Sequence, residues 1–336
     1  MRLHLAPLLT FVVVAASSLA SSARAQDFVG ARALGMGEAY RAIATGNDAI
    51  YFNPAGLPLL KRYSIEGQYV LNLVEENHQA DVSVVDSKTN DLAVGLAYTF
   101  QGSELTKRPT LEHTATLGVG YPIFPRMWLI GAGFKYKNVS DAIAGNYLNA
   151  VSADLGTMLQ IPGGINFAAV GYNLIPIRSV ESAHVPISAG FGLSWDLGPA
   201  STLIFGGDAV LGPQQTAAGI PDSSGLGSLR GALTGLTLSC DWLIDFETLE
   251  GSKSKFSGGL EYLVAELVPV RLGYVYDEIN PAREAANGNR PEPQHRVSAG
   301  IGLIVPYFGF DVSYQQSITD VDARVLAFAL KGFLPL

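Results

Sequence analysis

The chain has 336 residues, of which only 15% are Asp, Glu, Lys or Arg, and its formal net charge is −8. Soluble domains are roughly 25% charged, so this chain is unusually apolar. Disordered chains are more highly charged and nucleic-acid-binding chains carry basic surfaces, so the composition excludes both classes. Glycine is abundant, at 37 residues.

Residues 1–25 have the pattern of an export signal. Arg2 precedes an apolar run from Leu5 to Ala16, and Ala23-Arg24-Ala25 matches a cleavage site. We therefore expect the mature protein to begin at Gln26. An uncleaved anchor helix is the alternative, but the apolar run is shorter than the ~20 residues that a membrane span needs.

From residue 62 onwards the hydropathy pattern has a period of two, which is typical of strands. The segments are long, and Trp128 and Tyr136 lie at the two ends of one apolar face. A soluble β-sandwich also alternates. Long strands with aromatic residues near both membrane surfaces are instead typical of transmembrane barrels. The pattern therefore predicts an all-β fold, a transmembrane antiparallel β-barrel of the bacterial outer membrane.

Fifteen segments have the strand pattern, and single-chain bacterial barrels have an even number of strands. The alternation of long outer loops and short turns becomes inconsistent between residues 196 and 263, where one segment is spurious or one more strand is hidden in 211–234. We therefore predict fourteen strands, with sixteen as the alternative. The segments are 62–73, 77–86, 91–100, 111–121, 127–138, 149–161, 164–174, 186–196, 201–210, 235–246, 254–263, 268–277, 294–305, 307–316 and 323–333.

Residues 26–60 differ from the rest because they are dense in small residues and lack a clean period of two. Such a segment can form tight turns and short helices and can pack inside a narrow space. Pro54 biases Asn53 away from the α region. A periplasmic arm before the first strand is the alternative.

Two motifs in this segment carry a family resemblance. GARALGMG at 30–37 and NDAIYFNPAGL at 47–57 resemble the N-terminal hatch of FadL-type outer-membrane transport barrels, and of the related Por-type barrel subunits of a Bacteroidetes-style secretion system. After the signal peptide (1–25), the resemblance implies a hatch that plugs the lumen (26–60) and a fourteen-stranded barrel (61–336). Glu38 departs from the family, which usually has a small residue there. By resemblance the candidate gating residues are Asn53, Pro54, Ala55, Gly56, Gly35, Met36 and Gly37.

Motifs for other chemistry are missing from the sequence. The five histidines have no metal-ligand spacing, and there is no nucleophile-elbow motif, so we expect no enzyme, no cofactor and no metal. An outer-membrane enzyme using His113 with Glu112 and Asp311 is a minor alternative. Charges on the small-residue faces are expected to form ion pairs that fix the plug to the wall, because unpaired buried charge is costly. They are Lys135, Lys137, Asp154, Glu261, Arg271, Arg296 and Asp311.

Two functions follow from the resemblance. The first is passive transport of long-chain fatty acids or other hydrophobic small molecules, with release through the wall into the outer-membrane lipid. Release of this kind requires an interrupted strand, which we expect at 161–164 or within 196–234. The second is a Por-like barrel that docks secreted or envelope proteins without transporting small molecules. Nucleic acid is not an expected partner.

Overall fold

The computed structural model describes residues 28–73, 77–103, 110–125, 127–141, 147–175, 177–178, 186–197, 235–246, 252–265, 267–279, 293–319 and 323–334. Strands dominate these ranges, and the expected all-β class is confirmed. The strands are β1 (Tyr63–Asn72), β2 (Asn77–Asp86), β3 (Ala93–Ser103), β4 (Thr110–Phe124), β5 (Trp128–Asp141), β6 (Tyr147–Ile161), β7 (Ile165–Tyr172), β8 (Ile177–Arg178), β9 (Ser188–Asp196), β10 (Leu236–Asp245), β11 (Lys253–Val264), β12 (Val268–Asp277), β13 (Gln294–Ile304), β14 (Phe308–Ser317) and β15 (Arg324–Leu334).

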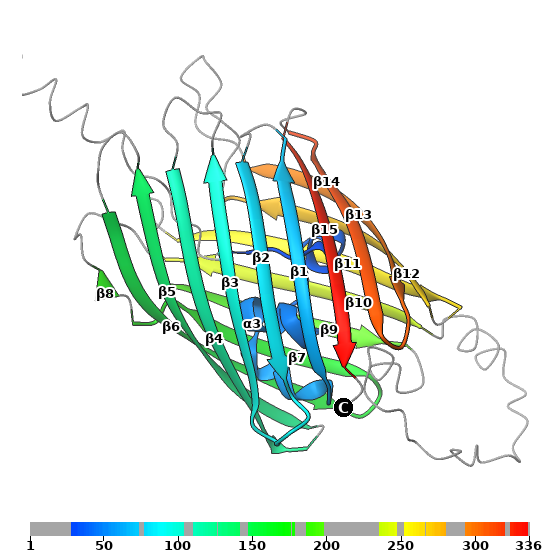
Figure 1. Ribbon diagram of the computed structural model, residues 1–336. Coiled ribbons are helices and arrows are strands. Elements are labelled where there is room, and N and C mark those ends of the chain that lie inside the picture. Colours follow the sequence, from blue (N-terminus) through cyan, green and yellow to red (C-terminus); the bar gives the residue numbers. More distant parts are fainter. Residues whose placement is uncertain are drawn as a thin grey trace, which may run out of the picture.

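Fourteen long antiparallel strands form one closed wall (Figure 1). The ring closes because β1 pairs with β15 and β5 pairs with β6. The two-residue β8 only extends the β7 side of β6. Since β9 pairs directly with β10, the wall has no strand between them. The expected segment 201–210 lies outside the described residues. The prediction of fourteen strands is confirmed.

The two faces of the wall have the expected character. Trp128 and Tyr136 are 41% and 49% exposed on the outer face, together with many other large apolar side chains. The inner face carries mainly Gly, Ser, Thr and paired charges. An apolar outside and a polar inside are typical of transmembrane barrels. Within the described ranges, no helix has the length and apolar character needed to cross a membrane.

The two ends of the barrel differ in their connections. The short connections β4–β5, β6–β7, β11–β12 and β13–β14 all join strand ends at one end. Short turns are typical of the periplasmic end. Because the strands are antiparallel, the long 197–235 connection also joins strand ends on this side. The alternation of long outer loops and short turns, which the sequence left inconsistent between residues 196 and 263, therefore breaks at this connection.

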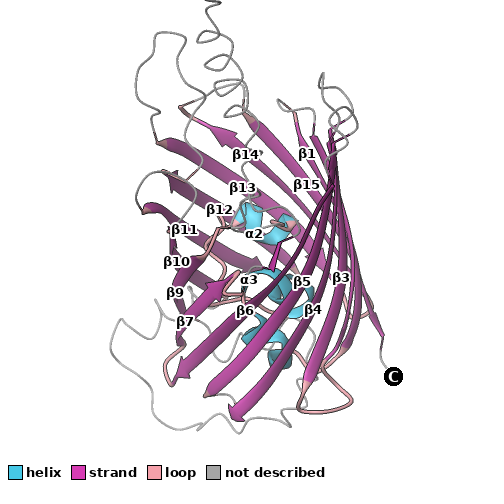
Figure 2. Cartoon of the chain, turned by 90° about the vertical axis from the view of Figure 1, so that its left-hand side faces the viewer, coloured by secondary structure: helices cyan, strands magenta, loops and turns pink. Residues whose placement is uncertain are grey.

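Residues 28–60, here called the lumen segment, lie inside the barrel (Figure 2). They form α2 (Ala31–Gly35), η2 (Gly46–Asp48), α3 (Ala49–Phe52) and η3 (Pro54–Leu59). Phe28 packs on Tyr51, and Tyr40 packs edge-on against Phe52, so the segment has a small aromatic core of its own. Short helices and a position inside a narrow space were expected from its composition. The segment is therefore not a periplasmic arm.

The wall is interrupted at the outer end of β7. Pairing of β7 with β9 ends at Tyr172 and Ser188, whereas β6 continues to Tyr147. Beyond this point β6 is paired on this side only by the Leu174 amide, which donates to the Ala153 carbonyl, and by the short β8. Asn173 follows with φ 54°, in the left-handed region that Asn tolerates better than most residues. We call this place the wall break; in Figure 2, β7 ends part way along its neighbour β6.

The expected site of interruption at 161–164 is wrong. Ile161 pairs with Ile165 across an ordinary tight turn, so the wall is continuous there. Gly163 and Gly164 have positive φ because they build this turn. Most of the second expected site, 196–234, lies outside the described residues. The interruption instead begins at Asn173, which is neither Pro nor Gly.

Candidate functional site

The Asn53-Pro54-Ala55 motif is fixed against three wall strands. Asn53 is fully buried and extended, with φ −163°, as Pro54 after it predicts. Its side chain accepts a hydrogen bond from the Ala55 amide at 3.1 Å. It also donates to the carbonyl of Thr157 on β6 at 3.2 Å. Asn53 therefore joins the lumen segment to the wall as well as capping η3.

A row of glycines makes room for this motif. Gly120, Gly131 and Gly156 lie directly opposite one another on β4, β5 and β6. A Cβ on Gly131 would lie 2.3 Å from the backbone of Pro54, and one on Gly156 would lie 2.2 Å from Asn53 Oδ1. Any side chain at these positions would displace the motif. We call this row the glycine seat.

The other expected motif, Gly35-Met36-Gly37, lies on a different part of the wall. A Cβ on Gly259 of β11 would lie 2.3 Å from the Met36 carbonyl oxygen, and one on Gly273 of β12 would lie 2.1 Å from the Gly37 amide nitrogen. The two motifs therefore do not form one site. They fix the two ends of the lumen segment to separate groups of strands. Gly56 packs within the segment, where a Cβ would meet the Ala44 carbonyl at 1.9 Å.

Glu38, the residue that departs from the family pattern, is an anchor. Its carboxylate lies 2.6 Å from Lys255 and 3.1 Å from Arg296. Arg296 also pairs with Asp277 at 2.5 Å. Glu38 has φ 63°, so the chain bends sharply there to bring the acid to the wall. An acid at this position strengthens the seating of the segment.

A second set of ion pairs holds α2. Arg32 binds Glu261 through two nitrogens, at 2.8 and 3.0 Å. Arg271 bridges Glu261 and Asp311, and Lys331 follows at 3.2 Å from Asp311. The expectation that lumen charges hold the lumen segment to the wall is thus confirmed for Glu261, which pairs with Arg32, and for Arg296, which pairs with Glu38.

The remaining expected lumen charges join strand to strand. Lys135 pairs with Asp154 at 2.9 Å, and Lys137 pairs with Glu112 at 2.7 Å. These pairs link β5 with β6 and β5 with β4. They stabilise the wall beside the lumen segment.

A third anchor, which the sequence reasoning missed, lies next to the wall break. Asp241 Oδ2 accepts from the amides of Tyr40 and Arg41 at 2.8 and 2.9 Å, and from Arg41 Nη1 at 3.0 Å. Arg41 Nε donates to the Tyr172 hydroxyl at 3.0 Å, and that hydroxyl donates to the Phe52 carbonyl at 2.5 Å. Tyr172 is the last residue of β7, so the lumen segment contacts the edge of the wall break directly.

The middle of the lumen segment is held by neutral hydrogen bonds as well. Asn47 donates to Ser83 on β2 at 3.0 Å and accepts from Ser64 on β1 at 2.6 Å. Tyr51 donates a short hydrogen bond to Asp81. Burial raises the pKa of Tyr51 well above its ordinary value, and the Asp81 charge adds to this rise. Tyr51 therefore remains a donor at any physiological pH.

Apolar side chains face the lumen beside the third anchor. Val170 and Tyr172 of β7, Leu243 of β10 and Ile279 after β12 form a buried cluster, here called the inner cluster. Val170 and Tyr172 are among the last three residues of β7 before the wall break. The inner cluster is therefore a small, packed apolar core at the inner side of the end of β7.

The residues of the enzyme alternative do not meet. His113 faces outward, where its Nδ1 lies 2.6 Å from the Tyr98 hydroxyl. Asp311 faces the lumen and pairs with Arg271 and Lys331. The wall separates the two side chains.

Comparison with solved structures agrees with the architecture. No protein-family model and no curated protein matches the sequence. The monoaromatic hydrocarbon channel CymD is similar, with a TM-score of 0.61 at 12% identity, over 91% of this chain and 97% of the other. The toluene transporter TodX of Pseudomonas putida has a TM-score of 0.60 at 11% identity, over 91% and 98%. A Pseudomonas aeruginosa FadL homologue has a TM-score of 0.56 at 9% identity, over 91% and 98%.

These identities are low, so the likeness concerns the fold. The strand count, the closed wall and the occupied lumen agree with the expectation from the N-terminal motifs. The apolar outer surface and the fold are those of a bacterial outer-membrane protein. The chain has the fold of the FadL-type outer-membrane transport barrels.

Proposed function

We propose that this barrel is a passive channel for small, uncharged hydrophobic molecules, which leave it through the wall break. The observation that supports this most is the inner cluster. It places apolar side chains of β7 and β10 at the point where β7–β9 pairing stops. The structurally similar proteins named for toluene and monoaromatic hydrocarbons add support for a cargo of this class.

The charges around the inner cluster favour a neutral cargo over a fatty acid. Arg41 and Lys135 lie over the Tyr172 ring, at 5.4 and 5.8 Å from its centroid. Arg41 is paired with Asp241, and the Lys135 ammonium is paired with Asp154. A carboxylate entering here would have to displace a buried partner, which is costly. A hydrocarbon needs no such exchange.

The anchors favour a route through the wall over displacement of the lumen segment. Breaking one buried ion pair costs about 3–5 kcal/mol. The segment is held by the pairs Arg32–Glu261, Glu38–Lys255 and Arg41–Asp241. Releasing it would break all three, so the released state is rarely populated. The segment therefore acts as a fixed plug that directs cargo sideways.

Uptake by cells tests the proposal. A bacterial host without its own hydrocarbon barrels is given radiolabelled toluene or oleate, with and without this protein. We expect faster toluene uptake and unchanged oleate uptake. Equal toluene uptake in both strains would refute the proposal, and faster oleate uptake alone would favour a fatty-acid carrier.

The inner cluster provides a matched pair of variants. Leu243→Asn introduces a polar side chain of similar size, and we expect it to reduce toluene uptake several-fold. Leu243→Ile keeps the inner cluster apolar and should leave uptake near normal, since volume-conserving apolar changes are tolerated. Equal uptake by both variants would show that cargo does not pass the inner cluster.

The docking alternative depends on the long loops, most of which lie outside the described residues. A pull-down from envelope extracts tests it separately. A specific partner together with absent toluene uptake would favour docking.

A further inference from the structure

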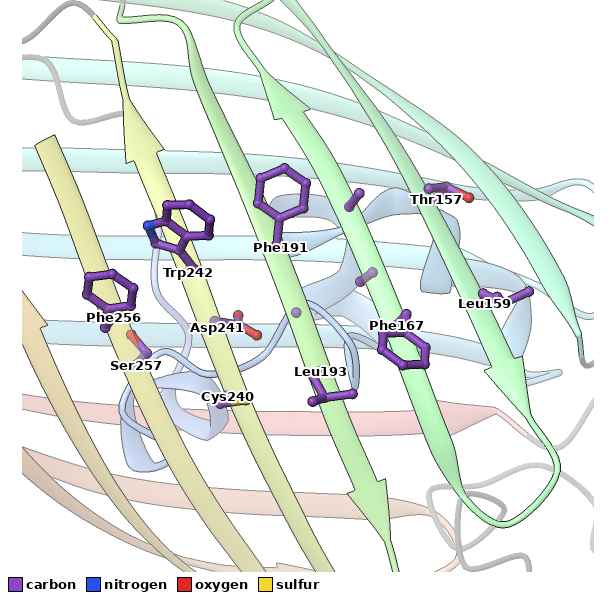
Figure 3. A pocket seen from close by; sticks show the side chains of 13 residues that line it. Thr157, Leu159, Phe167, Phe191, Leu193, Cys240, Asp241, Trp242, Phe256 and Ser257 are labelled. Atoms are coloured by element: carbon purple, nitrogen blue, oxygen red, sulfur yellow. The ribbon is translucent and has the colours of Figure 1, made fainter. Parts of the chain in front are cut away.

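A groove of about 620 Å³ crosses the outer, lipid-facing side of the wall (Figure 3). Residues of β6, β7, β9, β10 and β11 line it; most of them face outward and are apolar, and four face the lumen, namely Ala168, Gly192, Asp241 and Ser257. We call it the outer groove. Its aromatic members are Phe167, Phe191, Trp242 and Phe256.

The aromatic rings form a connected set along one side of the outer groove. Trp242 and Phe256 are stacked, with centroids 5.8 Å apart and an interplanar angle of 8°. Phe191 lies 5.9 Å from Trp242 on its other side. Their residues are direct neighbours in the strand register. Figure 3 shows the three rings side by side.

The hollow itself comes from small outward residues. Ala169 on β7 stands opposite Phe191 on β9, and Gly171 follows it toward the wall break. Cys240 is opposite Gly258 on the neighbouring strand. Large rings beside small residues leave space of the size of a small molecule.

The outer groove lies close to the wall break. Ala169 is three residues from Tyr172, about 10 Å along the strand. Leu174 covers the outer face of Gly171, where a Cβ would lie 2.8 Å from its side chain. Ile175, next to it, is 63% exposed. Apolar residues therefore lie on both sides of the end of β7, the inner cluster toward the lumen and Leu174 and Ile175 between the wall break and the outer groove.

We infer that the outer groove is an unloading site, which holds an uncharged monoaromatic molecule after it leaves the wall break and before it enters the bilayer. The inference rests on the proposed function and adds a ligand class and a place. Stacked or edge-on aromatic contacts add attraction beyond that of the buried apolar area, and acyl chains cannot make such contacts. An aromatic molecule therefore displaces lipid from this groove more readily than an aliphatic one does.

Trp242 is a reporter inside the site. The protein is reconstituted in nanodiscs after Trp128→Phe and Trp195→Phe, which leaves Trp242 as the only tryptophan. Bromobenzene, a heavy-atom quencher, is titrated in. The control reporter is Leu96→Trp on β3, combined with Trp242→Phe, because Leu96 is 54% exposed on the outer face away from the groove.

We expect quenching of Trp242 to saturate, with its midpoint about five-fold below the bromobenzene concentration that gives equal quenching at position 96. One stacking contact of ~1 kcal/mol corresponds to that factor. Linear, equal quenching of the two reporters would overturn the inference. A second result would also overturn the inference. In it, lipids with brominated acyl chains quench both reporters equally, and toluene does not relieve their quenching of Trp242.

A groove-filling variant separates this inference from the proposed function. Ala169→Leu fills the hollow, and we expect it to raise the Trp242 midpoint about five-fold. The matched control is Ala115→Leu, an exposed outward position on β4. Toluene uptake with no saturable Trp242 quenching would refute the unloading site and leave the channel intact. Absent uptake would refute the channel itself.

Discussion

The third anchor gives the sharpest test of how the lumen segment is held. Asp241 and Arg41 have side chains that are each only 1% exposed. Asp241→Ala removes three hydrogen bonds and leaves the Arg41 charge buried without its carboxylate. Loss of one partner of a buried ion pair costs about 3–5 kcal/mol. The equilibrium for local release of the segment should therefore rise by about 10²–10³.

Hydrogen exchange measures this equilibrium. The amides of Ile43 and Asn53 donate to Tyr40 and Ala49, within the lumen segment, so the mutation does not remove their acceptors. We expect their protection factors to fall by about 10²–10³ in the Asp241→Ala variant. A change below three-fold would refute the assigned role of the anchor.

Two further variants control this experiment. Ser239→Ala changes another lumen-facing residue of β10, whose hydroxyl makes only a long 3.5 Å contact with the Leu193 carbonyl, and should leave protection unchanged. The double variant Arg41→Met with Asp241→Leu removes both charges. Apolar replacement of a buried pair is often neutral, but the Tyr40 and Arg41 amides still lose their acceptor, so this variant should recover only part of the lost protection. A double variant as weak as Asp241→Ala would show that the charge is not the cause.

Three other predictions concern seating and the wall break. Gly131→Ala should displace the lumen segment and raise ion conductance in planar bilayers, whereas Gly133→Ala, whose Cβ would meet nothing closer than 3.4 Å, should conduct like the wild type. Asn53→Ala should cost about 1–3 kcal/mol, measured as lost exchange protection in η3, because it leaves buried groups unpaired. Asn173→Val should cost about 2–4 kcal/mol of stability in urea, since φ 54° strains a β-branched residue and the hydrogen bonds of the Asn173 side chain with Ser152 and Pro186 are lost; unchanged stability would refute both contributions.

Most of the wall could be predicted from the sequence, for a physical reason. Membrane strands must alternate between lipid and lumen, so Trp128 and Tyr136 already indicate the outer face. The uncertain count between 196 and 263 arose because alternation is a local signal. Only the direct pairing of β9 with β10 decides it.

The site was harder to predict because it depends on contacts between distant residues. Asp241 lies 200 residues from Arg41, and nothing in a local pattern links them. The glycine seat did leave a signal in the sequence, since Gly120 and Gly131 flank one turn symmetrically on the lumen face. Asn173 left none, because a polar residue at a strand end is ordinary.

The central claim is that cargo leaves through the wall break, and photolabelling tests it most directly. The mature protein in nanodiscs is illuminated with a diazirine derivative of toluene, and labelled residues are located by mass spectrometry. The account predicts label on Val170, Gly171 and Leu174 at the end of β7. Label concentrated instead at the periplasmic end of the lumen, on Arg62 and Phe333, would contradict it, because cargo would then pass beneath the lumen segment.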